Sequence, residues 1–296
     1  MNLKSFLLTI TTVFTVSSVF AQANILNAKS PEEIGVRTAA QKEVDNDKPL
    51  EYGYVDDRDI LFSKMTWEKI VLDERANFPL YYPTDTNNIG TDRRSLYDVL
   101  MKNIKNGKIK NLYDDSYLTT KRTLKDIEAS LSKIDTTEYG IEQLNAGEEL
   151  SAEFINRRDI TSAEIREYHI KGLWYFDKRQ AEMKYRLLAI APVAPDVNFI
   201  DSGEPDLVPL FWIFFPDARE VLHEAKSFNN ENSSIPFSFD HILNSRRFHG
   251  YIYKEENVQG DRQISEYVSQ NSLMQLLESE RIKDKIRDFE LDMWTY

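Results

Sequence analysis

The chain has 296 residues, with 37 lysines and arginines against 49 aspartates and glutamates, which gives a net charge of −12 at neutral pH. This excess of acid argues against nucleic-acid binding, which depends on cationic side chains that neutralise phosphates. The absence of cysteine excludes disulfide bonds, a thiol nucleophile and a lipid attached to a cysteine.

Residues 1–21 have the pattern of a secretory signal peptide. Lys4 supplies a basic start, residues 5–20 are uncharged, and the run closes on the small residue Ala21. A membrane anchor is the alternative, but the run is shorter and more polar than the ~20 apolar residues that cross a bilayer. We therefore expect cleavage before Gln22 and a mature protein that folds outside the cytoplasm and does not insert into the membrane.

The remaining chain divides into an arm and a domain. Residues 22–53 are polar, lack periodicity and carry several charges, so we expect a mobile N-terminal arm that orders against a partner. Residues 54–296 are expected to form a single α+β domain.

In the first half of that domain the apolar spacing predicts three helices. They span residues 60–72, 96–104 and 124–134, and the first is apolar on more than one face, as in a helix buried on two sides. Residues 77–83 are expected to form an extended turn bounded by prolines. Residues 134–160 are weakly patterned and predict a loop with a short helix.

The second half begins with strands. Apolar and polar residues alternate over 168–176 and again over 183–189, which predicts a hairpin, while 207–215 is apolar on both faces and predicts a central strand. Helices are expected afterwards, capped by Asp217, Ser238 and Ser272. The predicted fold is thus α+β, with a small antiparallel sheet at about residues 165–215 between N-terminal and C-terminal helices. One core is expected to hold Trp174, Phe176, Phe211, Ile213 and Phe215.

No pattern in the sequence points to catalysis or to a metal. The four histidines lack metal-ligand spacing, and there is neither a nucleophile elbow nor a glycine-rich phosphate loop. The acidic segment 196–206 lacks the alternating oxygens of a calcium loop and is expected to be solvated. We expect no catalytic residue and no cofactor. The alternatives are a hydrolase that uses a carboxylate pair with a histidine, such as Asp240 with His241, and a monomeric binding module.

A basic and aromatic cluster near the C-terminus is unusual in so acidic a chain. Arginine and tyrosine are favoured in interfaces, so we expect the cluster to contact a partner. The alternative is intramolecular: the arginines pair with acids of the same subunit, or lie near the carbonyls of a helix end. The cluster comprises Arg246, Arg247, Tyr251, Tyr253 and Lys254.

Several blocks of the sequence resemble the gliding-motility protein N family (GldN, also PorN) of the type IX secretion system of Bacteroidota. They follow one another in order over nearly the whole mature chain, and the acidic segment 194–206 matches no block. The blocks are residues 59–64 with Trp67, 72–83, 170–179, 190–193, 210–219, 239–255, 261–264 and 292–296.

The resemblance implies a non-enzymatic structural subunit. Such proteins assemble with an outer-membrane lipoprotein of the GldK/PorK type into a large periplasmic ring, which is linked to the periplasmic part of a motor protein of the GldM/PorM type. The machine exports proteins and, in gliding species, supports motility. We therefore expect self-association, a periplasmic location, and attachment to the outer membrane through the lipoprotein.

Overall fold

The computed structural model of the chain describes residues 30, 47–87, 93–136, 139, 143, 154–197, 206–229, 236–269 and 271–294. The chain divides into two compact units, Met1–Lys48 and Pro49–Tyr296, and the second is described below. The predicted signal peptide and residues 22–46 of the predicted arm, apart from Ser30, lie outside the described residues. Within the described part, no helix combines the length and the apolar character needed to span a membrane.

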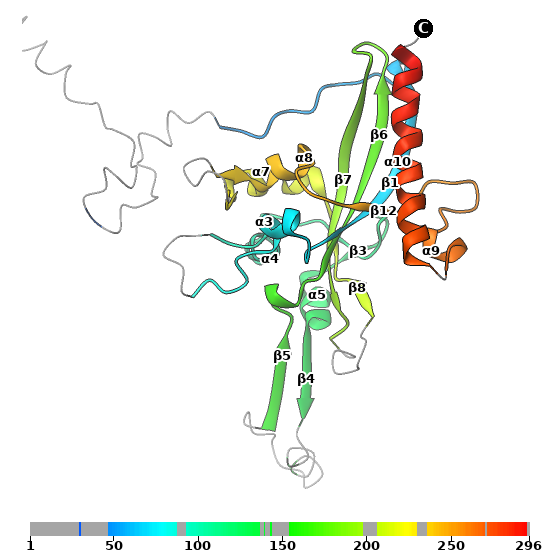
Figure 1. Cartoon of the computed structure of the whole chain (residues 1–296). Helices are drawn as coiled ribbons and strands as arrows, with labels where there is room; N and C mark the ends of the chain where they lie inside the picture. Colours follow the sequence, from blue (N-terminus) through cyan, green and yellow to red (C-terminus); the bar gives the residue numbers. More distant parts are fainter. Residues whose placement is uncertain are drawn as a thin grey trace, which may run out of the picture. The chain divides into compact units, whose positions relative to one another are not determined.

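An antiparallel sheet forms the centre of the second unit (Figure 1). In the described residues it has eight strands, in the order β12-β1-β6-β7-β9-β2-β3, with β8 attached to β7. The sheet is therefore larger than the predicted one, because it adds strands from both ends of the domain. The strands are β1 (Ile60–Val71), β2 (Leu112–Tyr113), β3 (Lys121–Arg122), β6 (Glu167–Asp177), β7 (Glu182–Pro195), β8 (Leu207–Pro209), β9 (Trp212–Phe214) and β12 (Tyr251–Glu255).

The helix predicted over residues 60–72 is wrong, because this segment is the strand β1. It pairs with β6 from Ile60 opposite Asp177 to Val71 opposite Glu167. Its apolar residues fall on more than one face because both faces of the strand are covered: Thr66, Trp67 and Glu68 are all buried although they are consecutive. The same pattern fits a helix buried on two sides, and only the pairing with distant strands distinguishes the two.

The predicted hairpin is confirmed as β6 and β7, which pair over eleven positions. The predicted central strand at 207–215 is instead two short strands. β8 ends at Pro209, and β9 lies inside the sheet between β7 and β2. Phe215 already begins a helix. Proline lacks the N–H that a continuous ladder would need, which explains the break after β8.

The helices surround this sheet. The helix predicted at 96–104 is confirmed, and the side chain of Ser238 caps α8 as expected. The helix predicted over 124–134 ends at Leu131, because the next five residues form a strand. The helix predicted to be capped by Asp217 begins at Phe215, so Asp217 lies in its first turn. The side chain of Asn271, rather than that of Ser272, accepts from the first N–H groups of α10. The helices are α3 (Phe78–Tyr81), α4 (Leu96–Lys105), α5 (Leu124–Leu131), α7 (Phe215–Glu224), α8 (Phe239–Asn244), α9 (Ile264–Tyr267) and α10 (Ser272–Trp294), with 3-10 turns η2 (Asp57–Asp59), η3 (Arg75–Asn77) and η5 (Ser162–Glu164).

Two segments for which an extended turn and a loop with a short helix were predicted have a different structure. The extended turn expected at 77–83 is mostly the helix α3, since proline is well tolerated in a first helical turn. The loop expected over 134–160 begins and ends in β4 (Ser132–Thr136) and β5 (Ile155–Asp159), which pair as a separate ribbon. A second small ribbon joins β10 (Lys226–Ser227) to β11 (Phe237–Ser238).

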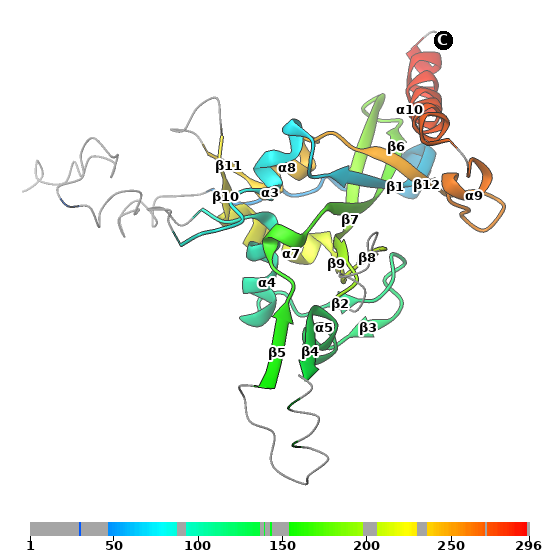
Figure 2. The same ribbon diagram turned by 60° about the horizontal axis from the view of Figure 1, so that its bottom comes forward.

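The hydrophobic interior is divided, so the prediction of a single core for the five aromatic and aliphatic residues is wrong. Phe211, Ile213 and Phe215 lie in the main core with α4, α7 and α8. Trp174 packs instead in a cluster built around α10, with Ile282 and its neighbours. Figure 2 shows α10 beside β1 and β12, away from α4 and α7.

Candidate functional site

The first arginine of the basic and aromatic cluster is half-buried, with 24% of its side chain exposed. Nη2 of Arg246 lies 2.6 Å from Oε2 of Glu68, whose side chain is 1% exposed. The guanidinium also faces the rings of Trp174, Tyr185 and Phe248 at 5.0, 4.2 and 5.2 Å. Burial acts to lower the pKa of Arg246, but the Glu68 carboxylate and the Tyr185 hydroxyl together raise the pKa above its ordinary value. Arg246 therefore pairs with an acid of the same subunit, which was the alternative to a partner contact.

The Arg246 site depends on close packing in the sheet below it. Tyr185 on β7 covers Gly172 on β6, and a Cβ atom added to Gly172 would lie 2.1 Å from the Tyr185 hydroxyl oxygen. Burial raises the pKa of Tyr185 far above its ordinary value. Four buried polar atoms here have no hydrogen-bond partner. They belong to Glu68, Trp174, Tyr185 and Arg246.

The other two basic residues of the cluster lie elsewhere. Arg247 is exposed and its guanidinium stacks on the ring of Phe237 at 4.5 Å. Nζ of Lys254 donates to the hydroxyl of Tyr117 at 2.8 Å and lies over the rings of Trp67 and Tyr117. The structure therefore disperses the three cationic groups, and Arg247 is the one that faces solvent.

The two tyrosines of the cluster are partly buried on β12. Burial raises the pKa of Tyr251 to about 12. The ring of Tyr253 lies 4.9 Å from that of His169, and Nζ of Lys69 lies 5.4 Å from the Tyr253 centroid. Both residues are intermediate in exposure, so only part of each side chain is available for contact with a partner.

The residues named for the hydrolase alternative do not converge. Asp240 is buried and forms an ion pair with Nε of Arg219 at 2.9 Å, whereas His241 is exposed and stacks on Phe237. Among the described residues, no group of three or more histidine, aspartate or glutamate side chains could hold a metal ion. Most of the acidic segment 196–206 lies outside the described residues.

A buried polar group does occur on β6. Nε2 of His169 lies 3.1 Å from Oε2 of Glu167, and Nζ of Lys69 lies 3.7 Å from the same oxygen. Burial lowers the pKa of His169, Lys69 lowers it further, and the Glu167 carboxylate opposes both. His169 is therefore held neutral.

This histidine predicts a pH dependence of stability. Its folded pKa lies below the ordinary value of 6.5, so the unfolded chain binds the proton first and stability falls as the pH drops below that value. Urea unfolding should show that the free energy of unfolding falls between about pH 7.5 and about pH 5.5. This fall should be smaller in His169→Gln than in the wild type. Equal losses in the two proteins would contradict this assignment. Glu167 titrates below 4.5, outside this window.

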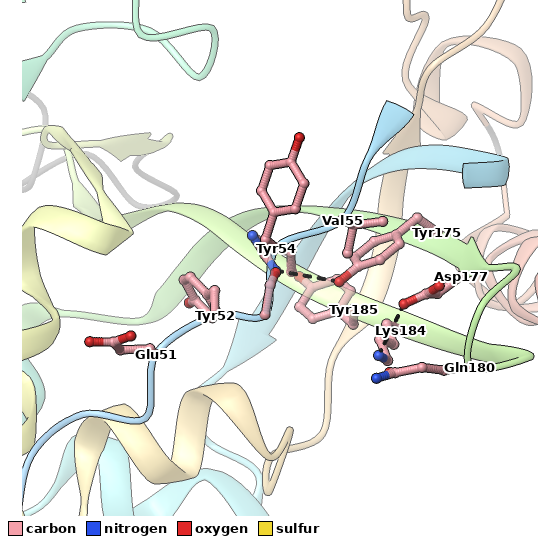
Figure 3. A pocket seen from close by; sticks show the side chains of 11 residues that line it. Glu51, Tyr52, Tyr54, Val55, Tyr175, Asp177, Gln180, Lys184 and Tyr185 are labelled. Carbon is pink, nitrogen blue, oxygen red and sulfur yellow. Dashed lines mark hydrogen bonds and ion pairs between the residues drawn. The ribbon is translucent and has the colours of Figure 1, made fainter. Parts of the chain in front are cut away.

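A site that the sequence analysis missed lies at the start of the second unit. Residues 50–55, here called the N-terminal strap, run beside the β6–β7 hairpin and enclose a cavity of about 280 Å³ with it (Figure 3). The ring of Tyr52 lies 4.2 Å from the guanidinium carbons of both Arg186 and Arg219, and its hydroxyl donates to Oδ1 of Asn244 at 3.0 Å. No local pattern reveals this site, since Tyr52 and Asn244 are 192 residues apart.

The comparisons with known proteins place the chain in a family. The family described as "Gliding motility associated protein GldN" matches residues 55–295. A search of curated proteins gave no match. The matched range includes every strand of the main sheet and both α8 and α10. The chain therefore belongs to the GldN family of gliding-motility associated proteins.

Proposed function

We propose that the protein is a non-enzymatic structural subunit of a periplasmic ring in the type IX secretion and gliding machinery. The observation that carries the proposal is the family match over residues 55–295. The arrangement of polar groups supports it, because Arg246, Asp240 and His169 are each engaged within the domain.

The surface of α10 supports a role in assembly. Four apolar side chains at the start of this helix are between 45% and 63% exposed. Contiguous exposed apolar residues of this kind are typical of protein interaction surfaces. They are Leu273, Met274, Leu276 and Leu277.

The proposed partners are those of the family: an outer-membrane lipoprotein of the GldK/PorK type, a motor protein of the GldM/PorM type, and further copies of this chain. Without a cysteine to carry lipid, the chain would reach the outer membrane through the lipoprotein. Arg247, which is exposed, is the member of the basic cluster proposed to contact a partner.

Co-purification from the cell envelope tests the proposal. A tagged protein should elute far above monomer mass together with the lipoprotein, and deletion of the lipoprotein should shift it to smaller species. Arg247→Glu should weaken this association without lowering the melting temperature. Elution as a monomer in the presence of both partners would instead favour an independent binding module or an enzyme.

Export itself gives a separate prediction. If residues 1–21 are a signal peptide, the mature protein begins at Gln22 and fractionates with the periplasm or the outer membrane. Mass spectrometry of the N-terminal peptide from envelope-extracted protein provides the measurement. Recovery of a peptide that begins at Met1 would contradict export by cleavage.

A further inference from the structure

The N-terminal strap is attached to the domain mainly through one side chain. Tyr52 stacks between two guanidinium groups, whereas the flanking Leu50 and Tyr54 are each 83% exposed. The strap has no helix or strand of its own. Its carbonyl oxygens accept from the same arginines: that of Leu50 from Arg219 at 2.6 Å and that of Gly53 from Arg186 at 3.2 Å.

The slot that holds Tyr52 is fixed by contacts that do not involve the strap. Nε and Nη2 of Arg219 lie 2.9 and 3.3 Å from the carboxylate of Asp240. The side-chain amide of Asn244 donates to the same carboxylate at 2.8 Å. Arg186 is on β7, and its guanidinium also donates to the hydroxyl of Tyr175 at 3.4 Å. These contacts would remain if the strap left the slot.

Removal of the strap would also leave an unfavourable surface. The two guanidinium groups would face the space now filled by the Tyr52 ring, and each would lose a cation–π contact and a carbonyl acceptor. An aromatic side chain on an extended segment restores both kinds of contact. The strap of a second copy of the chain would restore every one of these contacts, because it has the same sequence.

We propose that, in the assembled protein, the strap of each copy occupies the Arg186–Arg219 slot of a neighbouring copy. The inference rests on the proposed function, because it requires copies of the chain to lie side by side. Exchange of an identical segment keeps every contact, so it costs little free energy and links neighbouring subunits. Lifting the strap breaks no strand pairing or helix, since regular structure begins only at Asp57.

Thiol cross-linking tests the exchange cleanly because the chain has no cysteine. Glu51 on the strap and Ser245 next to Asn244 are both exposed, so each tolerates replacement. One tagged chain carries Glu51→Cys and a second, differently tagged chain carries Ser245→Cys. The two are expressed together, the assembly is extracted from the envelope, and a short bis-maleimide is added.

Exchange predicts a covalent heterodimer of the two tagged chains. Tyr52→Ala in the first chain should reduce its yield by about tenfold or more, since two cation–π contacts and a hydrogen bond are lost. Tyr52→Phe keeps the aromatic ring, so this variant should retain most of the heterodimer yield. A heterodimer whose yield is unchanged by Tyr52→Ala would reflect mere proximity of the two positions and would overturn the exchange.

A chain that carries both cysteines separates this inference from the proposed function. The free subunit should give an intrachain link, which shows that the reagent spans the two positions, and the assembly should give interchain links. Assembled protein that gives only intrachain links overturns the exchange and leaves the structural role intact. Protein that never assembles overturns both.

Discussion

Arg246→Glu is expected to lower the free energy of unfolding by about 3–5 kcal/mol, the usual result of breaking a buried ion pair. The substitution places a second carboxylate beside Glu68, whose side chain is 1% exposed, and removes the cation that faces three aromatic rings. For a domain of this size we expect a fall in melting temperature of about 10 °C. Thermal unfolding followed by circular dichroism provides the measurement.

Arg247→Glu is the matched control. It changes the same charge one position along the chain, but Arg247 is exposed and its guanidinium lies over the face of Phe237. Its stability should stay within about 0.5 kcal/mol of the wild type. Similar melting curves for the two variants would show that the Glu68–Arg246 pair contributes little. Replacement of both partners by methionine should recover much of the lost stability.

Gly172→Ala is expected to cost about 3 kcal/mol or more, although it adds a single methyl group. The new Cβ would lie 2.1–2.4 Å from three atoms of the Tyr185 ring and hydroxyl, and that ring lies under the guanidinium of Arg246. Overpacking of this kind forces side chains out of their rotamers or displaces the backbone. Gly53→Ala, where nothing lies within 4 Å of the added atom, should be nearly neutral.

A double-mutant cycle identifies the clash as the cause. Tyr185→Ala removes the ring and should itself be destabilising, by about 3–5 kcal/mol. In that background Gly172→Ala should add little, so the two effects should be strongly non-additive. Additive losses would mean that the alanine acts on the strand backbone rather than through Tyr185.

The features that the sequence predicted well are local. The spacing of Leu96, Val99 and Ile104 defines one face of α4, and Ser238 caps α8 through a hydrogen bond to the residue three positions on. The β6–β7 hairpin could be predicted from the alternation of apolar and polar residues in two segments and from the turn between them. In each case the residues that determine the element lie within it, so a short window is enough.

The features that the sequence did not predict depend on distant partners. The segment 60–71 is a strand because β6 and β12 lie on either side of it. Arg246 points into the domain because it pairs with the buried Glu68, which lies 178 residues earlier in the chain. The Tyr52 site likewise joins the strap to α7, α8 and β7. Charge and aromatic content marked the C-terminal cluster as unusual, but they could not separate an internal ion pair from a surface contact.

The position of β12 in the sheet has a consequence for the timing of folding. One edge of β1 finds its pairing strand only in residues 251–255. The hydrogen bond from Nζ of Lys64 to the carbonyl oxygen of Glu256 joins residues that are 192 positions apart. Such long-range closure slows folding, because the loop entropy is lost before the contacts form. A chain that emerges from a membrane channel with its N-terminus first would expose the edge of β1 and the ring of Phe62 until α10 follows. If the chain is exported in this way, it should be most prone to aggregation before α10 has emerged, and most in need of a chaperone then.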